Sequence, residues 1–221
     1  MNETQLRDEL VRVGRSLHAR GYVHGTTGNL SARLDDGYLI TATDACLGDL
    51  DAASLVKVDA AGKALAAGVR PSKTLALHLR IYAAEPEVRC IVHTHSTHLV
   101  RASLELPFAE SRDDFLPPIT PYFVMKVGHV PLLAYHRPGD PALADLVAAA
   151  IERARGRGVP IRAVMLARLG PNVWHETPAG AMAVLEELEE TARLWMSTEP
   201  KPAPLRPADI EALRVHFGAR W

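Results

Sequence analysis

Residues 90–98 read Cys-Ile-Val-His-Thr-His-Ser-Thr-His, and the rest of the chain is interpreted around this stretch. The apolar run 88–92 predicts a short buried β-strand. It leads into His93 and His95, which stand two positions apart and would point to the same face of a strand. Two neutral imidazoles on one face can bind a Zn²⁺-like ion at about 2.0–2.1 Å. Ser96 is expected to begin a helix that carries His98 away from the pair.

Two histidines alone do not define a metal site. The chain has 10 histidines in 221 residues, so a chance pair with no joint role is the plain alternative. A catalytic zinc site uses three protein ligands, and a His-x-His sequence supplies two of them. The spacing therefore predicts a fragment of a metal site and leaves the third ligand open.

The composition indicates one large domain that acts on a small molecule. Hydrophobic residues make up 48% of the chain, which is ample for a sizeable core. The 25 Lys and Arg nearly balance the 26 Asp and Glu, so neither a nucleic acid nor a membrane is expected as a partner. Cys46 and Cys90 form no disulfide framework or metal motif and suit a reducing compartment. The polar N-terminus and the lack of a long apolar run favour a cytoplasmic protein.

The apolar spacing predicts helices and strands in alternation, with antiparallel neighbours in the sheet. The turn Asp35-Asp36-Gly37 is typical of a hairpin between two strands. Helices are expected at about 4–20, 71–84, 96–103, 141–156, 177–195 and 208–217. Strands are expected at about 30–34, 38–41, 55–58, 88–92, 130–133, 161–166 and 172–175. We expect a main domain of residues 1–198, followed by a Pro-rich tail with a C-terminal helix at 199–221.

Two loops are candidates for binding a substrate anion. Residues 24–33 contain glycines, which let backbone amides approach an anion, and the polar side chains of Thr26 and Asn29. The alternative for this loop is an ordinary turn. The second loop contains Ser72 and Lys73 at the start of a helix, where free amides and a positive charge favour an anion. The alternative there is that Ser72 merely caps the helix.

Taken together, these motifs resemble the class II aldolase and adducin family. The matching segments are Gly-Thr-Thr-Gly-Asn-Leu-Ser-Ala-Arg at 25–33, Pro-Ser-Lys at 71–73, His-Thr-His-Ser at 93–96 and the helix at 186–193. Segments 116–122, 124–128 and 135–141 resemble in particular the 3-oxo-tetronate 4-phosphate decarboxylase group. The resemblance implies an α/β fold, an α/β/α sandwich with a mostly antiparallel central sheet. It also implies a homo-oligomer, usually a tetramer, with active sites between subunits.

The resemblance further implies a divalent metal, commonly zinc, with manganese or another divalent ion as alternatives. Family members hold this ion through three histidines and use a glutamate as acid and base. His93 and His95 match two of the metal ligands. Asn29 and Ser72 match positions that usually hold a substrate phosphate.

Tyr122 is a candidate proton donor. It follows prolines at 117, 118 and 121, and because each proline fixes its own φ the segment is expected to be extended and to hold Tyr122 in one place. By resemblance, Tyr122 matches a tyrosine that reaches into the active site of a neighbouring subunit.

Three positions depart from the family pattern. Thr74 stands where a glutamate follows Pro-Ser-Lys, and a threonine cannot act as a carboxylate base near neutral pH. Leu169 stands where the third histidine precedes a glycine, and leucine cannot bind a metal. Asp44 stands where a Thr-Pro-Thr-Gly turn has its glycine, and its carboxylate should repel a phosphate by a few kcal/mol if the site is poorly hydrated.

The leading hypothesis is a rebuilt active site. The chain would be a metal-dependent lyase that cleaves a C–C bond in a small hydroxy- or oxo-acid, which need not carry a phosphate. The third ligand would come from Asp44, His129, His175 or water, and Asp44 or Tyr122 would take over proton transfer. Thr74 stays a candidate catalytic position.

Two other interpretations remain open. Catalysis could be lost, leaving a binding module or oligomeric scaffold, as the adducin branch of the family illustrates. The chain could instead be an altered active-site variant of an ordinary decarboxylase. The retention of both strand histidines favours the rebuilt site, while the joint loss of base and ligand favours the scaffold.

Overall fold

A seven-stranded sheet forms the centre of the computed structural model, which describes residues 1–221. The strand order is β3-β2-β1-β4-β7-β6-β5, and every neighbouring pair is antiparallel except β5 and β6. β4 therefore lies in the middle of the sheet, between β1 and β7. The strands are β1 Asn29–Leu34, β2 Gly37–Thr41, β3 Leu55–Val58, β4 Cys90–His93, β5 Leu132–Leu133, β6 Ala163–Leu166 and β7 Gly170–His175.

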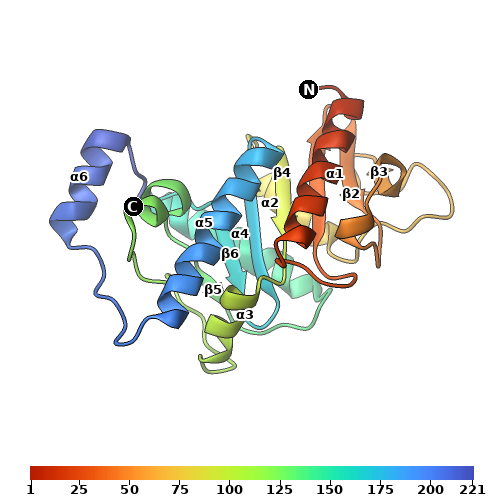
Figure 1. The fold of residues 1–221 in the computed structure, drawn as a ribbon. Helices are drawn as coiled ribbons and strands as arrows, with labels where there is room; N and C mark the ends of the chain where they lie inside the picture. The colour runs from red at the N-terminus through yellow and green to blue at the C-terminus, as the bar shows by residue number, and fades with distance from the viewer.

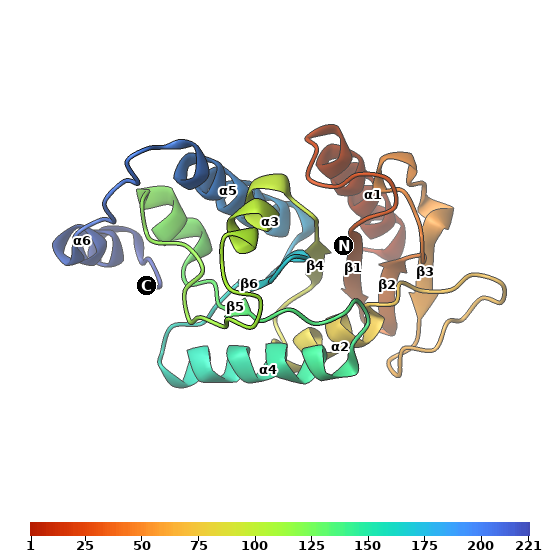
Figure 2. The same cartoon turned by 90° about the horizontal axis from the view of Figure 1, so that it is seen from below.

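Helices cover both faces of the sheet (Figure 1). Seen from below, α1, α3 and α5 lie on one side and α2 and α4 on the other (Figure 2). The predicted α/β/α sandwich with a mostly antiparallel sheet is confirmed. The helices are α1 Glu3–Ala19, α2 Leu75–Ala84, α3 Thr97–Leu104, α4 Pro141–Gly156, α5 Pro178–Ser197 and α6 Pro207–Phe217.

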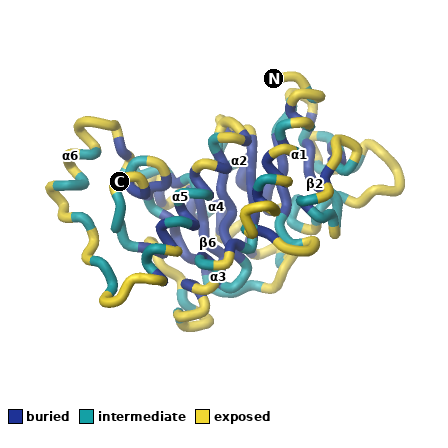
Figure 3. The backbone as a smooth tube through the Cα atoms, viewed as in Figure 1, coloured by how far each residue is buried: buried dark blue, intermediate teal, exposed yellow.

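Alternation along the strands divides the core into two layers. In β4, Cys90 and Val92 belong to the core cluster under α1, α3 and α5, while Ile91 packs in the cluster under α2 and α4. Successive strand residues point to opposite faces, so His93 points to the same side as Ile91. The tube coloured by burial shows the central strands as the most buried part of the chain (Figure 3). His93 is therefore held at the end of a buried strand, facing the α2 and α4 layer.

The C-terminal segment 199–221 packs against the main body of the chain through α6 and Trp221. α6 lies beside the π-helical turn η3 (Phe123–Val127), and the ring of Trp221 stacks on His129 at a centroid distance of 4.1 Å. The expected C-terminal helix is confirmed, while the division into residues 1–198 and 199–221 stays a prediction. Segment 117–122 is not extended throughout, because Pro121 and Tyr122 already take helical conformation before η3. Every helix is too short or too polar to cross a membrane.

Candidate active site

A cavity of about 310 Å³ opens at the end of the sheet where β4 stops. It lies between the sheet and the N-terminal ends of α2 and α4, and the loop 138–140 before α4 forms part of its wall. The cavity brings together the predicted site residues except Tyr122 and two candidates for the third ligand, His129 and His175. The predicted residues that line it are Thr26, Asn29, Asp44, Ser72, Lys73, Thr74, His93 and His95.

The two histidines of the β4 segment are prepared to bind a cation. Their ring centroids lie 5.1 Å apart. The Nδ1 of His93 lies 2.9 Å from the carbonyl oxygen of Pro171 and can donate to it, which leaves the lone pair on Nε2 free. Burial and the neighbouring His95 lower the pKa of His93 to about 4. Burial also lowers the pKa of His95, followed by the influence of His24, so both rings are neutral at pH 7.

His93 lies in the middle of a polar row across the sheet. Asn29 of β1 is its direct partner on one side and Asn172 of β7 on the other. Residues directly opposite on antiparallel strands point to the same face, so all three side chains face the α2 and α4 layer. Both asparagines are buried, and Oδ1 of Asn29 and both amide atoms of Asn172 lack a hydrogen-bond partner. The sequence alone singled out Asn29 but gave no reason to single out Asn172.

Two glycines let their loops approach the backbone of residues 93–94 closely. Gly28 has φ +80°, and a Cβ there would lie 2.9 Å from the carbonyl oxygen of His93. Gly170 has φ +122°, and a Cβ there would lie 2.0 Å from the carbonyl oxygen of Thr94. Neither position can carry a side chain without moving the backbone. The close approach at Gly28 therefore positions the loop 24–28 against the cavity, which an ordinary surface turn would not require.

The segment 71–73, expected to bind an anion, is hydrogen-bonded to the turn 41–44. The backbone N–H of Ser72 donates to the carbonyl of Thr41 at 3.0 Å, and the hydroxyl of Thr43 donates to the carbonyl of Pro71 at 2.7 Å. Ser72 does not cap α2, since the residue before the helix is Thr74 and no side chain caps it. The Ser72 hydroxyl instead lies 3.0 Å from that of Thr74. Both hydroxyl residues line the cavity, and so do the carboxylate residues Asp44 and Asp140.

Asp44 sits at the exposed rim of the cavity. Its φ is +62°, in the left-handed region that glycine adopts most easily and aspartate tolerates. The backbone of the turn therefore keeps the conformation expected of a glycine. Because Asp44 is exposed, water screens its charge, and repulsion of a phosphate is closer to about 1 kcal/mol than to the few kcal/mol expected for a dry site.

Neither predicted histidine supplies the third ligand. His129 contacts Asp114 at 2.6 Å and stacks on Trp221, and His175 lines a different cavity beside α5. Leu169 lines the cavity of His93 and His95. The ring centroid of His24 lies 6.4 Å from that of His95, but no three His, Cys, Asp or Glu side chains lie close enough to hold an ion together, so neither His24 nor Asp44 completes the set. The two imidazoles fit a divalent cation as two of its ligands.

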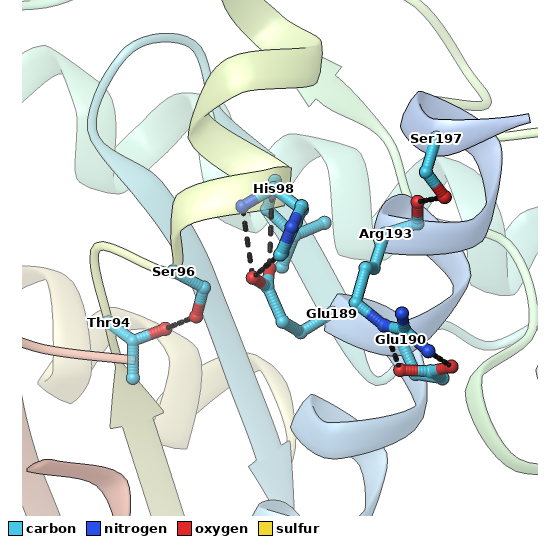
Figure 4. A network of polar contacts seen from close by, with 8 residues as sticks. Thr94, Ser96, His98, Glu189, Glu190, Arg193 and Ser197 are labelled. Carbon is cyan, nitrogen blue, oxygen red and sulfur yellow. Dashed lines mark hydrogen bonds and ion pairs between the residues drawn. The ribbon is translucent and has the colours of Figure 1, made fainter. Parts of the chain in front are cut away.

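A buried carboxylate fixes the segment that follows the histidines (Figure 4). Glu189 of α5 accepts from the backbone N–H groups of His98 at 2.9 Å and Leu99 at 3.1 Å, and lies 2.8 Å from Nδ1 of His98. Glu189 thus caps the start of α3 from another helix. The hydroxyls of Thr94 and Ser96 lie 2.7 Å apart before it. This contact joins residues 91 positions apart, so no local pattern predicts it.

Tyr122 lies apart from the cavity within one chain. It directly precedes η3 and is 60% exposed. It is not among the residues that line the cavity of its own chain.

The chain belongs to the class II aldolase and adducin family. Residues 8–196 match the family described as Class II Aldolase and Adducin N-terminal domain. The chain is 51% identical to a 3-oxo-tetronate 4-phosphate decarboxylase of Cupriavidus necator over 224 residues, covering 99% of each chain. It is 42% identical to the protein of the same name in Escherichia coli K12, covering 90% of each.

A solved structure agrees with this assignment. The crystal structure of YgbL from Klebsiella pneumoniae superposes with a TM-score of 0.85 at 38% identity, covering 97% of this chain and 100% of that one. The relatives' names include a phosphate, so they lend no support to the expectation of a substrate without one.

Proposed function

We propose that the chain is a divalent-metal-dependent lyase that decarboxylates a small 3-oxo acid. The observation that carries this proposal is the combination of Thr74 at the position of the family's base with the retained pair His93 and His95 in one cavity. The pair supplies metal ligands, while Thr74 offers no carboxylate to remove a proton. Of the reactions that such a site could run, decarboxylation has the least need of a base.

The two kinds of C–C cleavage differ in their first proton transfer. Aldol cleavage must remove a proton from a hydroxyl group, and a general base typically contributes a factor of about 10²–10⁴ to such a step. A 3-oxo acid is already ionised at neutral pH. When its C1–C2 bond breaks, the electron pair moves toward the C3 oxygen, CO₂ leaves and an enolate remains. A proton then adds to C2. The bond-breaking step therefore works without the carboxylate that Thr74 lacks.

The residues of the cavity divide into a cation side and an anion side. A divalent ion held by His93 and His95, zinc first and manganese second by resemblance, would supply a positive charge near the developing enolate oxygen. On the anion side, Lys73 is exposed and has no ion-pair partner, and Ser72 lies in the turn just before α2. We propose that this side, with Thr26 and Asn29, binds the far end of the substrate, including a phosphate when one is present.

A second copy of the chain is expected to complete the site. Tyr122 is 60% exposed and stands outside its own cavity. We propose that Tyr122 of a neighbouring copy delivers the proton to C2 in a homotetramer, as the resemblance implies. Asp44, at the cavity rim, is the alternative proton carrier within the chain.

The test is release of CO₂ from 3-oxo-tetronate 4-phosphate made in situ. We expect the metal-loaded protein to accelerate release at least about tenfold over a His93→Ala/His95→Ala double variant. Thr74→Glu should leave the rate within a few-fold, because the base is not used in bond breaking. Equal rates for the wild-type protein and the double variant would reject the proposal. 3-oxo-tetronate without phosphate, assayed in parallel, decides whether the phosphate is needed.

A catalytically silent scaffold is the second candidate. It is favoured by the absence of a third His, Cys, Asp or Glu beside the histidine pair. It predicts no CO₂ release from either acid and an oligomer whose mass is unchanged in the His93→Ala/His95→Ala variant. Sedimentation of both proteins measures the second point.

A further inference from the structure

We propose that Asn172 supplies the third protein contact to the cation, an amide oxygen in place of the imidazole lost at Leu169. This inference rests on the proposed metal-dependent function. It assigns the site two nitrogens, from His93 and His95, and one neutral oxygen. Divalent cations can bind the oxygen of a side-chain amide, and hard cations prefer oxygen ligands.

The position of Asn172 is the first argument. It pairs directly with His93 across β4 and β7, so the two side chains leave the sheet side by side on the same face. It also lines the same cavity as His93 and His95. β7 begins at Gly170, so Asn172 follows closely after Leu169. The oxygen thus comes from the same loop and strand that would otherwise carry the imidazole.

The unmet hydrogen bonds of Asn172 are the second argument. The residue is 1% exposed, and neither its Nδ2 nor its Oδ1 has a partner. Burying an amide without partners costs free energy, so native chains rarely keep one unless a ligand or ordered water completes it. The strand neighbours in register with Asn172 are His93 and Val164, and Val164 is apolar. The partner must therefore come from the cavity.

Asn29 is the rival for this role and serves as the matched control. It flanks His93 from β1, is 6% exposed and has an unpartnered Oδ1. It differs in that its Nδ2 is not left buried without a partner, and in that it belongs to the segment 24–33 expected to hold the substrate anion. Asn172 has both amide atoms unmet and lies on the side of Leu169. The prediction therefore separates the two asparagines.

The experiment measures metal binding by the full chain and needs no substrate. Protein stripped with a chelator is titrated with Zn²⁺ and with Mn²⁺, and bound metal is counted by mass spectrometry after desalting. We expect the wild-type chain to bind one equivalent, Asn172→Ala to lose affinity at least about tenfold, and Asn172→Asp to stay within about threefold or bind more tightly. Asn29→Ala should stay within about threefold.

Two further measurements distinguish a ligand from a structural residue. The visible spectrum of the Co²⁺-loaded protein should change in Asn172→Ala and not in Asn29→Ala, because the spectrum reports the coordination shell. Leu169→His in the Asn172→Ala background should restore the lost affinity. If Asn172→Ala folds poorly, Asn172→Ser and Asn172→Asp answer the same question.

The outcomes separate this inference from the function on which it rests. Unchanged metal affinity and spectrum in the Asn172 variants, with normal binding by the wild type, would overturn the inference and leave the lyase proposal standing. An equal loss in Asn29→Ala would also overturn it. A wild-type chain that binds less than about a tenth of an equivalent of either ion would remove both.

Discussion

Glu189 and Asn172 are both buried polar residues beside the segment 93–99, yet their surroundings differ. Glu189 is 4% exposed, and its two carboxylate oxygens accept from two backbone N–H groups, with the His98 ring within hydrogen-bond distance. Asn172 is 1% exposed, and neither polar atom of its amide has a partner. One cluster is complete within the chain, and the other is not.

The contrast is between a buried polar group that has its hydrogen-bond partners within the chain and one that has none there. A buried polar group with all its hydrogen bonds stabilises one arrangement, and removing it exposes its partners to an apolar environment. A buried polar group without partners costs stability in the free protein. Such a group persists where function requires it.

Glu189→Ala should produce the largest loss of stability. The change leaves the N–H groups of His98 and Leu99 without an acceptor at the start of α3, and we expect the free energy of unfolding to fall by about 3 kcal/mol. Urea denaturation measures this value. Glu190→Ala is the control, because its ion pair with Arg193 is exposed and contributes little to stability. Equal losses in the two variants would erase the distinction drawn for Glu189.

Acid should destabilise the metal-free protein through His78. The Nδ1 atom of this ring is hydrogen-bonded to the hydroxyl oxygen of Ser31 at 2.7 Å. Its Nε2 atom is buried without a partner. Burial, and next the nearby His93, lower the pKa of His78 from 6.5 to about 3. The unfolded chain binds more protons between these values, so the stability present above pH 6.5 is lost as the pH falls toward 3.

The expected size of the acid effect is about 2 kcal/mol for His78 between pH 7 and pH 5. Glutamine in His78→Gln cannot take up this proton. Between pH 7 and pH 5 the free energy of unfolding of this variant should therefore fall by about 2 kcal/mol less than that of the wild type. Denaturation of both proteins at the two pH values gives the difference. Parallel pH curves for the two proteins would show that His78 is not held neutral by burial.

Asn172→Val should stabilise the metal-free protein. Valine is similar in size and removes an amide with no partners, so the free energy of unfolding should rise by about 1 kcal/mol. Thermal and urea denaturation of chelator-treated protein measure the gain. A loss of stability would mean that the amide already has a structural partner, and the contrast with Glu189 would fail.

Asp44→Gly should have the smallest effect. Asp44 is exposed at the cavity rim, and removing its charge should tighten binding of inorganic phosphate about fivefold, or about 1 kcal/mol. Isothermal titration at low and high salt measures it, and the gain should shrink at high salt. Asp49→Gly, an exposed carboxylate outside the cavity wall, is the control. A gain that survives high salt would show that Asp44 is less hydrated than its exposure indicates.

The fold could be predicted from the sequence because the local residue patterns agree with the tertiary packing. Leu6, Leu10, Val13 and Leu17 recur on one side of a helix, and all four are buried in the core. Gly37 follows two aspartates and closes the β1–β2 hairpin as expected. Such signals need only neighbouring residues, so they can be read along the chain.

Only those residues of the site that lie on recognisable motifs could be predicted from the sequence. His93, His95, Ser72 and Lys73 come from short motifs and do share one cavity. Asn172 was not predicted, because its importance depends on strand register with His93, which the sequence does not state. The extended conformation expected for 117–122 failed at its end, because Pro121 fits the first turn of a helix as well as an extended chain.

The left-handed backbone at Asp44 bears on how this cavity could change over generations. Its φ of +62° admits glycine freely and aspartate or asparagine with little strain, but few other side chains. Glycine and aspartate codons differ by a single nucleotide. A lineage can therefore switch the charge at the mouth of the cavity back and forth in one mutational step without rebuilding the turn, so related chains should alternate among these three residues there.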